Sequence, residues 1–189
     1  MVWWQGWDNC PELVKQVYNS WKHNNPTWEI HRLSKYNISD YLEIDYLYNE
    51  NITLQAKSDI IRINILEKYG GIYADSTLVC LQPLDNWIND KIAENGFWMY
   101  HGTGAGNCLI PVDGKYNGGC IWFIVSEKES YMITKWKEKI DLFWKNEYNL
   151  RSYSFFWCDQ LFYSLYCNDE IFRNHWDTVD YIFCDDIGQ

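Results

Sequence analysis

The apolar residues of this chain recur at two spacings, and each spacing predicts one kind of element. Helical spacing predicts a helix that begins at Pro11 and ends before Asn24, and further helices over 54–69, 129–144 and 155–166. Short apolar runs predict strands over 2–4, 28–33, 72–74 and 97–100, and the apolar run over 120–125 is expected to be ordered. Residues 78–81 are expected to be extended, and a short helix is expected near Trp87.

The order of these elements predicts an α/β fold. A strand, a helix and a second strand open the chain, and this order favours a mostly parallel, mixed sheet flanked by helices. The segment 101–118 is rich in glycine, so we expect a long loop that closes over a ligand. We predict a single domain over 1–189, and the strand directly after Met1 indicates a piece cut from a longer chain.

Charge and composition exclude several classes of protein. The chain has 26 acidic and 16 basic residues and a net charge of −10, which argues against nucleic acid as a partner. The sequence has neither an apolar run that spans a bilayer nor a leader-like start, so we expect a cytoplasmic protein without membrane insertion. Its 7 cysteines include no CxxC pair, which predicts buried thiols in a reducing compartment. The 12 Trp and 15 Tyr can fill a core or stack on sugars, and composition leaves both open.

Two groups of polar residues can carry chemistry. Asp59 and Arg62 share one face of the helix predicted over 54–69, either as a structural ion pair or as part of a site. Asp75 follows the strand predicted over 72–74, at the carboxyl end where ligands bind in open α/β sheets. A carboxylate there can coordinate a divalent cation, with hydroxyls from Ser76 and Thr77 nearby, although a turn also explains such a run.

Several segments together resemble a known signature. These segments read AKSDIIR over 56–62, YGGIYADST over 69–77 and PLD over 83–85, with weaker matches at WWQGWDNCP over 3–11 and IWFI over 121–124. The pattern resembles the capsular polysaccharide synthesis family of glycosyltransferases, which is similar to the wider group named for a sugar-binding region with a DxD motif. Some members are encoded by large viruses of algae, which makes such a virus a candidate source of this chain.

The resemblance implies a GT-A fold that holds a nucleotide sugar and a divalent metal, Mn²⁺ or Mg²⁺. It implies contacts of Trp4, Gln5 and Gly6 with the base and ribose, of Asp59 with the donor sugar or ribose, and of Arg62 with the sugar or diphosphate. Tyr73, Ala74 and Ser76 would complete the donor site around Asp75, which matches the first Asp of the motif. Thr77 stands where the second Asp is expected. The second metal ligand is therefore open among Thr77, Asp159, His175 and Asp185.

Physical chemistry agrees with a metal. A departing nucleoside diphosphate gains negative charge, and a protein of net charge −10 needs a local cation such as a metal on Asp75, assisted by Arg62. On the acceptor side, Asp159 follows the aromatic run over 153–157 and is expected to orient or deprotonate a hydroxyl, unless it is a helix-surface residue.

These observations predict a metal-dependent glycosyltransferase. It would move a sugar from a UDP-sugar, such as UDP-glucose, to a glycan acceptor, with retention of configuration as the resemblance implies. Two alternatives stay open from the residues alone. The aromatic side chains suit a non-catalytic carbohydrate-binding module, and paired carboxylates suit a glycoside hydrolase.

Overall fold

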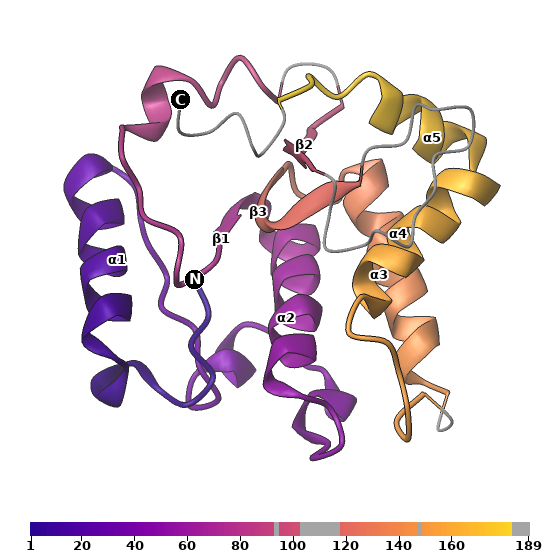
Figure 1. The fold of residues 1–189 in the computed structure, drawn as a ribbon, viewed down its shortest axis with the longest axis horizontal. Helices are drawn as coiled ribbons and strands as arrows, with labels where there is room; N and C mark the ends of the chain where they lie inside the picture. The colour runs from indigo at the N-terminus through magenta and orange to yellow at the C-terminus, as the bar shows by residue number, and fades with distance from the viewer. Residues whose placement is uncertain (93–94, 103–117, 147–148, 183–189) are drawn as a thin grey trace.

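The computed structural model describes residues 1–92, 95–102, 118–146 and 149–182 (Figure 1). Its helices are α1 (Glu12–Asn24), α2 (Leu54–Tyr69), α3 (Tyr131–Trp144), α4 (Trp157–Asn168) and α5 (Glu170–Asp177). Its strands are β1 (Gly71–Ala74), β2 (Phe97–His101) and β3 (Gly119–Ser126). Short 3-10 turns cover Trp7–Asn9, Ile38–Asp40, Asp45–Tyr48 and Leu84–Asn86.

The sheet is small and antiparallel. Its strand order is β1-β3-β2, and β3 pairs antiparallel with both neighbours, with Tyr73 opposite Ile124 and Trp98 opposite Val125. The mostly parallel sheet that the sequence predicts is not found in the described residues. The predicted strands over 2–4 and 28–33 meet only in an isolated parallel bridge between Val2 and Leu33, and 78–81 forms no strand. The reason is that apolar spacing reveals an extended segment but not the direction of its partner.

The predicted bounds of helix α2, residues 54–69, are confirmed. It begins at Thr53, whose hydroxyl oxygen accepts a hydrogen bond from the Ala56 N–H at 3.3 Å. It ends at Gly70, which adopts a positive φ of 71°. A side chain at Gly70 would also meet the backbone nitrogen of Lys128 at 2.6 Å, so only glycine fits between α2 and the end of β3.

The other elements shift the predictions by a few residues. The predicted helices at 129–144 and 155–166 correspond to α3 and α4, and the helix near Trp87 is the 3-10 turn Leu84–Asn86. Helix α5 has no counterpart among the predictions, since its eight residues were too few for a periodic signal. Most of the predicted loop over 101–118 lies outside the described residues.

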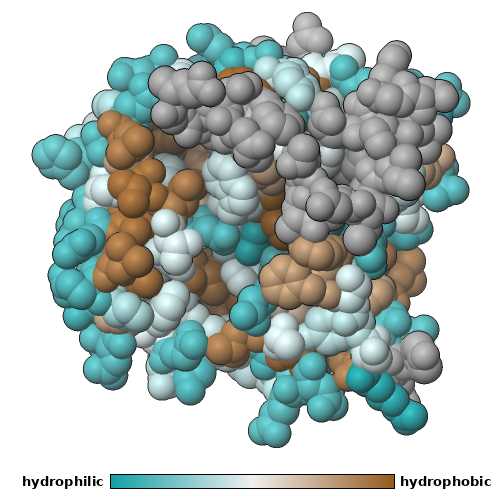
Figure 2. Space-filling view, in the orientation of Figure 1, coloured by the Kyte–Doolittle hydropathy of each residue, from teal (hydrophilic) through white to brown (hydrophobic). Residues whose placement is uncertain are grey.

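The core explains most of the aromatic excess. The largest fully buried side chains include Trp98, Trp136, Trp144 and Trp157. Helix α2 stands in the middle, with α1 on one side and the group α3, α4 and α5 on the other (Figure 1). Apolar surface gathers on the side where α1 lies (Figure 2). No described helix has the length and apolar character required to cross a bilayer. The thiols of Cys10, Cys80 and Cys158 are free and buried, whereas Cys108 and Cys184 lie outside the described residues.

Candidate active site

Arg62 joins the two polar groups that the sequence singles out. Its Nη2 lies 3.0 Å from Asp59 Oδ1 on the same helix and 3.2 Å from Asp75 Oδ1 at the end of β1. The i,i+3 spacing brings the first pair together on α2. Arg62 reaches Asp75 because the chain reverses direction at Gly70, so that β1 runs back beside α2.

Further hydrogen bonds hold the Arg62 guanidinium in place. Its Nη1 donates to the Ile121 carbonyl of β3. Its planar group also lies over the ring of Tyr73, at 4.6 Å from the ring centroid. The Tyr73 hydroxyl donates to Asp75 Oδ1 at 2.8 Å and lies 2.9 Å from the Ser58 hydroxyl. The cation is therefore fixed by α2, β1 and β3 together.

The carboxylates around Arg62 have unusual proton affinities. Burial raises the pKa of Asp59 to about 7; Arg62 opposes this shift, and the negative charges of Asp159 and Asp75 add to it. Burial likewise raises the pKa of Asp159 to about 6. Burial works against the charge of Arg62, yet its neighbours Tyr73, Asp59 and Asp75 raise its pKa overall. Perturbed carboxyl groups of this kind are typical of functional sites.

These side chains line an open cleft of about 470 Å³, which we call the carboxylate cleft. Its lining residues come from the N-terminal segment, α2, the end of β1, β3 and the start of α4: Val2, Trp3, Trp4, Gln5, Leu54, Gln55, Ser58, Asp59, Arg62, Asp75, Ser76, Thr77, Gly119, Cys120, Ile121, Trp122, Phe155, Phe156 and Asp159. Polar and charged groups thus converge between aromatic walls, the usual composition of a small-molecule site.

The match to a protein family covers nearly the whole chain. Residues 1–184 match the family described as capsular polysaccharide synthesis protein. The chain belongs to this family. Its resemblance to that family, predicted from the motifs, is confirmed.

Named relatives point in the same direction. A Saccharomyces cerevisiae protein, HOC1, which is named as a glycosyltransferase, is 27% identical over 53% of this chain and 28% of its own length. An Acanthamoeba polyphaga mimivirus protein, also named as a glycosyltransferase, is 32% identical over 46% of this chain and 37% of its own length. The chain therefore spans about a third of the length of these curated relatives.

The fold is also similar to that of a solved glycosyltransferase. The structure titled PaToxG Glycosyltransferase superposes with a TM-score of 0.53 at 16% identity, over 92% of this chain and 70% of that chain. At this identity the similarity concerns the fold, which is shared although the described sheet has only three strands.

The cleft of this family member contains most of the residues predicted for the site. Trp4, Gln5, Asp59, Arg62, Asp75, Ser76, Thr77 and Asp159 all line it. Tyr73 is buried behind the cleft wall, and its hydroxyl donates a hydrogen bond to Asp75, which lines the cleft. Gly6 and Ala74 are not among the lining residues. His175 is on α5 with its ring against Tyr131 and does not line the cleft, and Asp185 lies outside the described residues.

Sequence reasoning missed several residues of the cleft. Ser58 belongs to the recognised motif but received no role, although it lies 2.9 Å from the Tyr73 hydroxyl. Gln55 and Phe155 face the cleft from α2 and from the turn before α4. Lys57 holds its ammonium group 5.0 Å from the centre of the Trp4 ring, where it fixes that ring at the cleft. The helical spacing of Gln55, Ser58, Asp59 and Arg62 was the available signal.

The donor atoms at Asp75 fit a metal that shares its ligands with a substrate. Oδ1 of Asp75 is engaged by Tyr73 and Arg62, whereas Oδ2 makes no hydrogen bond or ion pair within the described chain. The hydroxyls of Ser76 and Thr77 make none either, within the same residues. Among the described residues, no group of three or more His, Cys, Asp or Glu side chains could hold a metal ion. A divalent ion would therefore need phosphate oxygens as further ligands, as Mg²⁺ usually does.

Proposed function

We propose that this chain is a glycosyltransferase domain that uses a UDP-sugar, such as UDP-glucose, in the carboxylate cleft. The observation that carries the proposal is the Asp59–Arg62–Asp75 group, with Asp59 and Arg62 buried, in an open cleft of a capsular polysaccharide synthesis family member. Because the group holds one cation and two acidic side chains, a ligand with concentrated negative charge would bind there together with a divalent metal, with the charge of Arg62 beside it. The diphosphate of a nucleotide sugar is such a ligand.

We assign the charge stabilisation to the chain's own cation and to a divalent metal. Arg62 is pre-positioned by Asp59, Tyr73 and Ile121, so it offers its charge without reorganisation when the diphosphate departs. Asp75 would hold Mn²⁺ or Mg²⁺ through Oδ2, and the ion, when bound, supplies Lewis-acid stabilisation of the leaving group.

We assign the acceptor side to Asp159, which lines the cleft at the start of α4. The bond from sugar C1 to the diphosphate oxygen breaks and UDP departs, and a bond from C1 to the acceptor oxygen forms on the same face of the sugar. The Asp159 carboxylate orients the acceptor hydroxyl and takes its proton, a role that suits a carboxyl whose pKa is raised to about 6 by burial. Retention of configuration is part of the proposal, and proton NMR of the product's anomeric centre tests it.

Calorimetric titration with UDP, with and without Mn²⁺, tests the proposal directly. We expect heat of binding, and a raised melting temperature, that depend on both ligands, because a ligand of the folded state stabilises it. ADP and GDP serve as matched nucleotide controls. A protein that responds to no nucleotide, yet binds or cleaves oligosaccharides without metal, would be a carbohydrate-binding module or a hydrolase instead.

The proposal extends to partners and compartment. We propose a glycan as acceptor, no nucleic acid as partner and action in the cytoplasm, that of the host if the source is a virus. The net charge of −10 and the buried thiols of Cys10, Cys80 and Cys158 support a reducing compartment without nucleic acid. Immunoblots of separated cell fractions test the compartment, and alkylation of the thiols at lysis shows whether they are free in the cell.

A further inference from the structure

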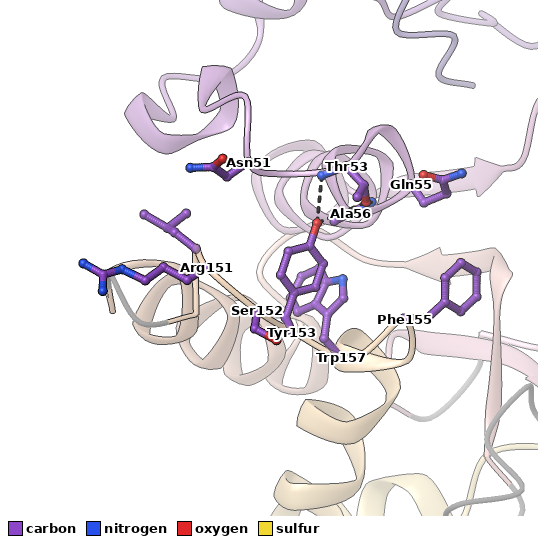
Figure 3. Close-up of a pocket in the computed structure, with 10 residues that line it drawn as sticks. Asn51, Thr53, Gln55, Ala56, Arg151, Ser152, Tyr153, Phe155 and Trp157 are labelled. Carbon is purple, nitrogen blue, oxygen red and sulfur yellow. Dashed lines mark hydrogen bonds between the residues drawn. The ribbon is translucent and has the colours of Figure 1, made fainter.

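A second depression opens beside the carboxylate cleft, between the start of α2 and the segment before α4 (Figure 3). We call it the side hollow; it has a volume of about 490 Å³. Gln55 and Phe155 line both depressions, so the side hollow continues the cleft rather than standing apart from it. A ligand in the cleft and a ligand in the side hollow would therefore both lie against Gln55 and Phe155.

The floor of the side hollow is aromatic and fixed. The Tyr153 hydroxyl accepts a hydrogen bond from the Thr53 N–H at 2.8 Å and donates to Thr53 Oγ1 at 3.1 Å, which ties the floor to the first turn of α2 (Figure 3). The Tyr153 ring packs edge-on against Trp144 at 4.8 Å. Trp157, also in the lining, is 2% exposed. Because core side chains hold this floor, the hollow exists before any ligand arrives.

Phe155 lies at the rim that the two depressions share. Its side chain is 72% exposed, and the ring meets Phe156 edge-on at 5.1 Å. Figure 3 shows Phe155 and Gln55 at one end of the hollow, with Asn51 and Arg151 at the other. Because Phe155 lines both depressions, its exposed ring is placed to stack on a ligand that lies where they meet.

Three polar side chains of the side hollow have no partner within the described residues. The side chains of Asn51, Gln55 and Arg151 make no hydrogen bond or ion pair to any part of the chain that the structure describes. They offer amide donors, amide acceptors and a planar cation around an aromatic floor. A pyranose has the matching surface, with an apolar C–H face and a rim of hydroxyl groups that both donate and accept.

We propose that the side hollow binds a pyranose unit of the acceptor glycan, next to the unit whose hydroxyl is glycosylated in the carboxylate cleft. This inference rests on the proposed function, because it takes the cleft as the donor site. Phe155 stacks on the sugar face at the joint, and Asn51, Gln55 and Arg151 bond its hydroxyls. Arg151 is the one cation in the lining, so a neutral sugar fits better than a multiply charged phosphate.

Saturation-transfer NMR with maltose, cellobiose, lactose and mannobiose, in the presence of UDP and the diamagnetic ion Mg²⁺, tests this assignment. We expect at least one disaccharide to receive saturation from the native protein. Phe155→Ala and Arg151→Ala should each weaken that binding about tenfold, the loss expected for one stacking or charged contact. Phe155→Trp should retain it. Leu142→Ala, at an apolar side chain of α3 that is 66% exposed and lines neither depression, is the matched control.

The two levels of the proposal fail in different ways. If UDP does not bind, the proposed function is wrong. If UDP binds and no disaccharide receives saturation, or if binding survives in both Phe155→Ala and Arg151→Ala, the side hollow is not an acceptor site. Saturation of a Ser- and Thr-containing peptide, with none of the sugars, would also overturn the assignment in favour of a polypeptide acceptor. Melting temperatures equal to that of Leu142→Ala verify that the variants fold.

Discussion

Helices α1 and α2 differ in where their charged and polar side chains lie: the charged ones of α1 are exposed, whereas several charged and polar ones of α2 are buried. On α1, apolar Val14, Val17 and Trp21 are buried, and the charged residues lie on the outer face. On α2, Lys57, Asp59, Arg62 and Asn64 are all buried, with at most 7% exposed. Removal of charges from water is costly, and an ion pair in the interior often adds no net stability. A helix that buries charge beside a cleft therefore indicates function, whereas an amphipathic helix such as α1 indicates only packing.

Replacement of Arg62 by methionine should give the largest effect. Arg62→Met keeps the length of the side chain but leaves Asp59 and Asp75 without their cation, and we expect a loss of about 3 kcal/mol or more in the free energy of unfolding. The loss should be greater at pH 8 than at pH 5, because buried Asp59, with a pKa of about 7, can take a proton in acid. Urea unfolding at the two pH values measures both.

The matched control is on the other helix. Lys15→Met on α1 removes an exposed partner of Glu12, and we expect a change within about 0.5 kcal/mol. If Lys15→Met and Arg62→Met lower the free energy of unfolding equally, the buried charges of α2 contribute no more to stability than the exposed charges of α1.

Removal of the Asp75 carboxylate should separate activity from folding. The Asp75 side chain is 32% exposed, and an asparagine at this position can still accept the hydrogen bond from the Tyr73 hydroxyl. We therefore expect Asp75→Asn to fold. Its metal-dependent turnover of UDP-sugar should fall at least about hundredfold, a change of about 2.7 kcal/mol in activation free energy. Asp75→Ala should abolish that turnover. Full activity in either variant would show that the metal is held elsewhere.

His101 extends the comparison to a buried base away from the cleft. It is 5% exposed between the rings of Trp176 and Tyr181, and its Nδ1 has no hydrogen-bond partner within the described residues. Burial lowers its pKa to about 4. The unfolded chain therefore binds the proton more readily between pH 6.5 and pH 4, so stability falls as the pH falls through this window.

The slope should approach about 1.4 kcal/mol per pH unit in the lower part of that window. His101→Phe retains a ring and loses the proton site, so the difference in unfolding free energy between the two proteins isolates this contribution. Contributions from Asp59 and Asp159 are common to both proteins and cancel in the difference. A difference that does not change from pH 7 to pH 4 would contradict a buried neutral His101.

The local part of the site was accessible from the sequence. The bounds of α2, the shared face of Asp59 and Arg62 and the place of Asp75 after β1 all follow from periodicity and from the glycines at the end of the helix. The family followed from the same residues, because their motif is contiguous. Assignment of His175 to the metal had only its place in the chain behind it, and the structure places it on α5 against Tyr131 instead.

The sequence by itself determined helices α1 to α4, the polar face of α2 and the carboxylate after β1, because each depends on residues a few positions apart. Tertiary structure alone decided the antiparallel direction of the sheet, the contact of Arg62 with the Ile121 carbonyl and the place of Gln55 and Phe155 in the lining of both depressions. The contact of Arg62 with Ile121 joins residues 59 positions apart, and that of Thr53 with Tyr153 joins residues 100 positions apart. The physical reason is that strand pairing and long-range packing are fixed by the sum of many weak contacts in the folded chain, and no local spacing records that sum.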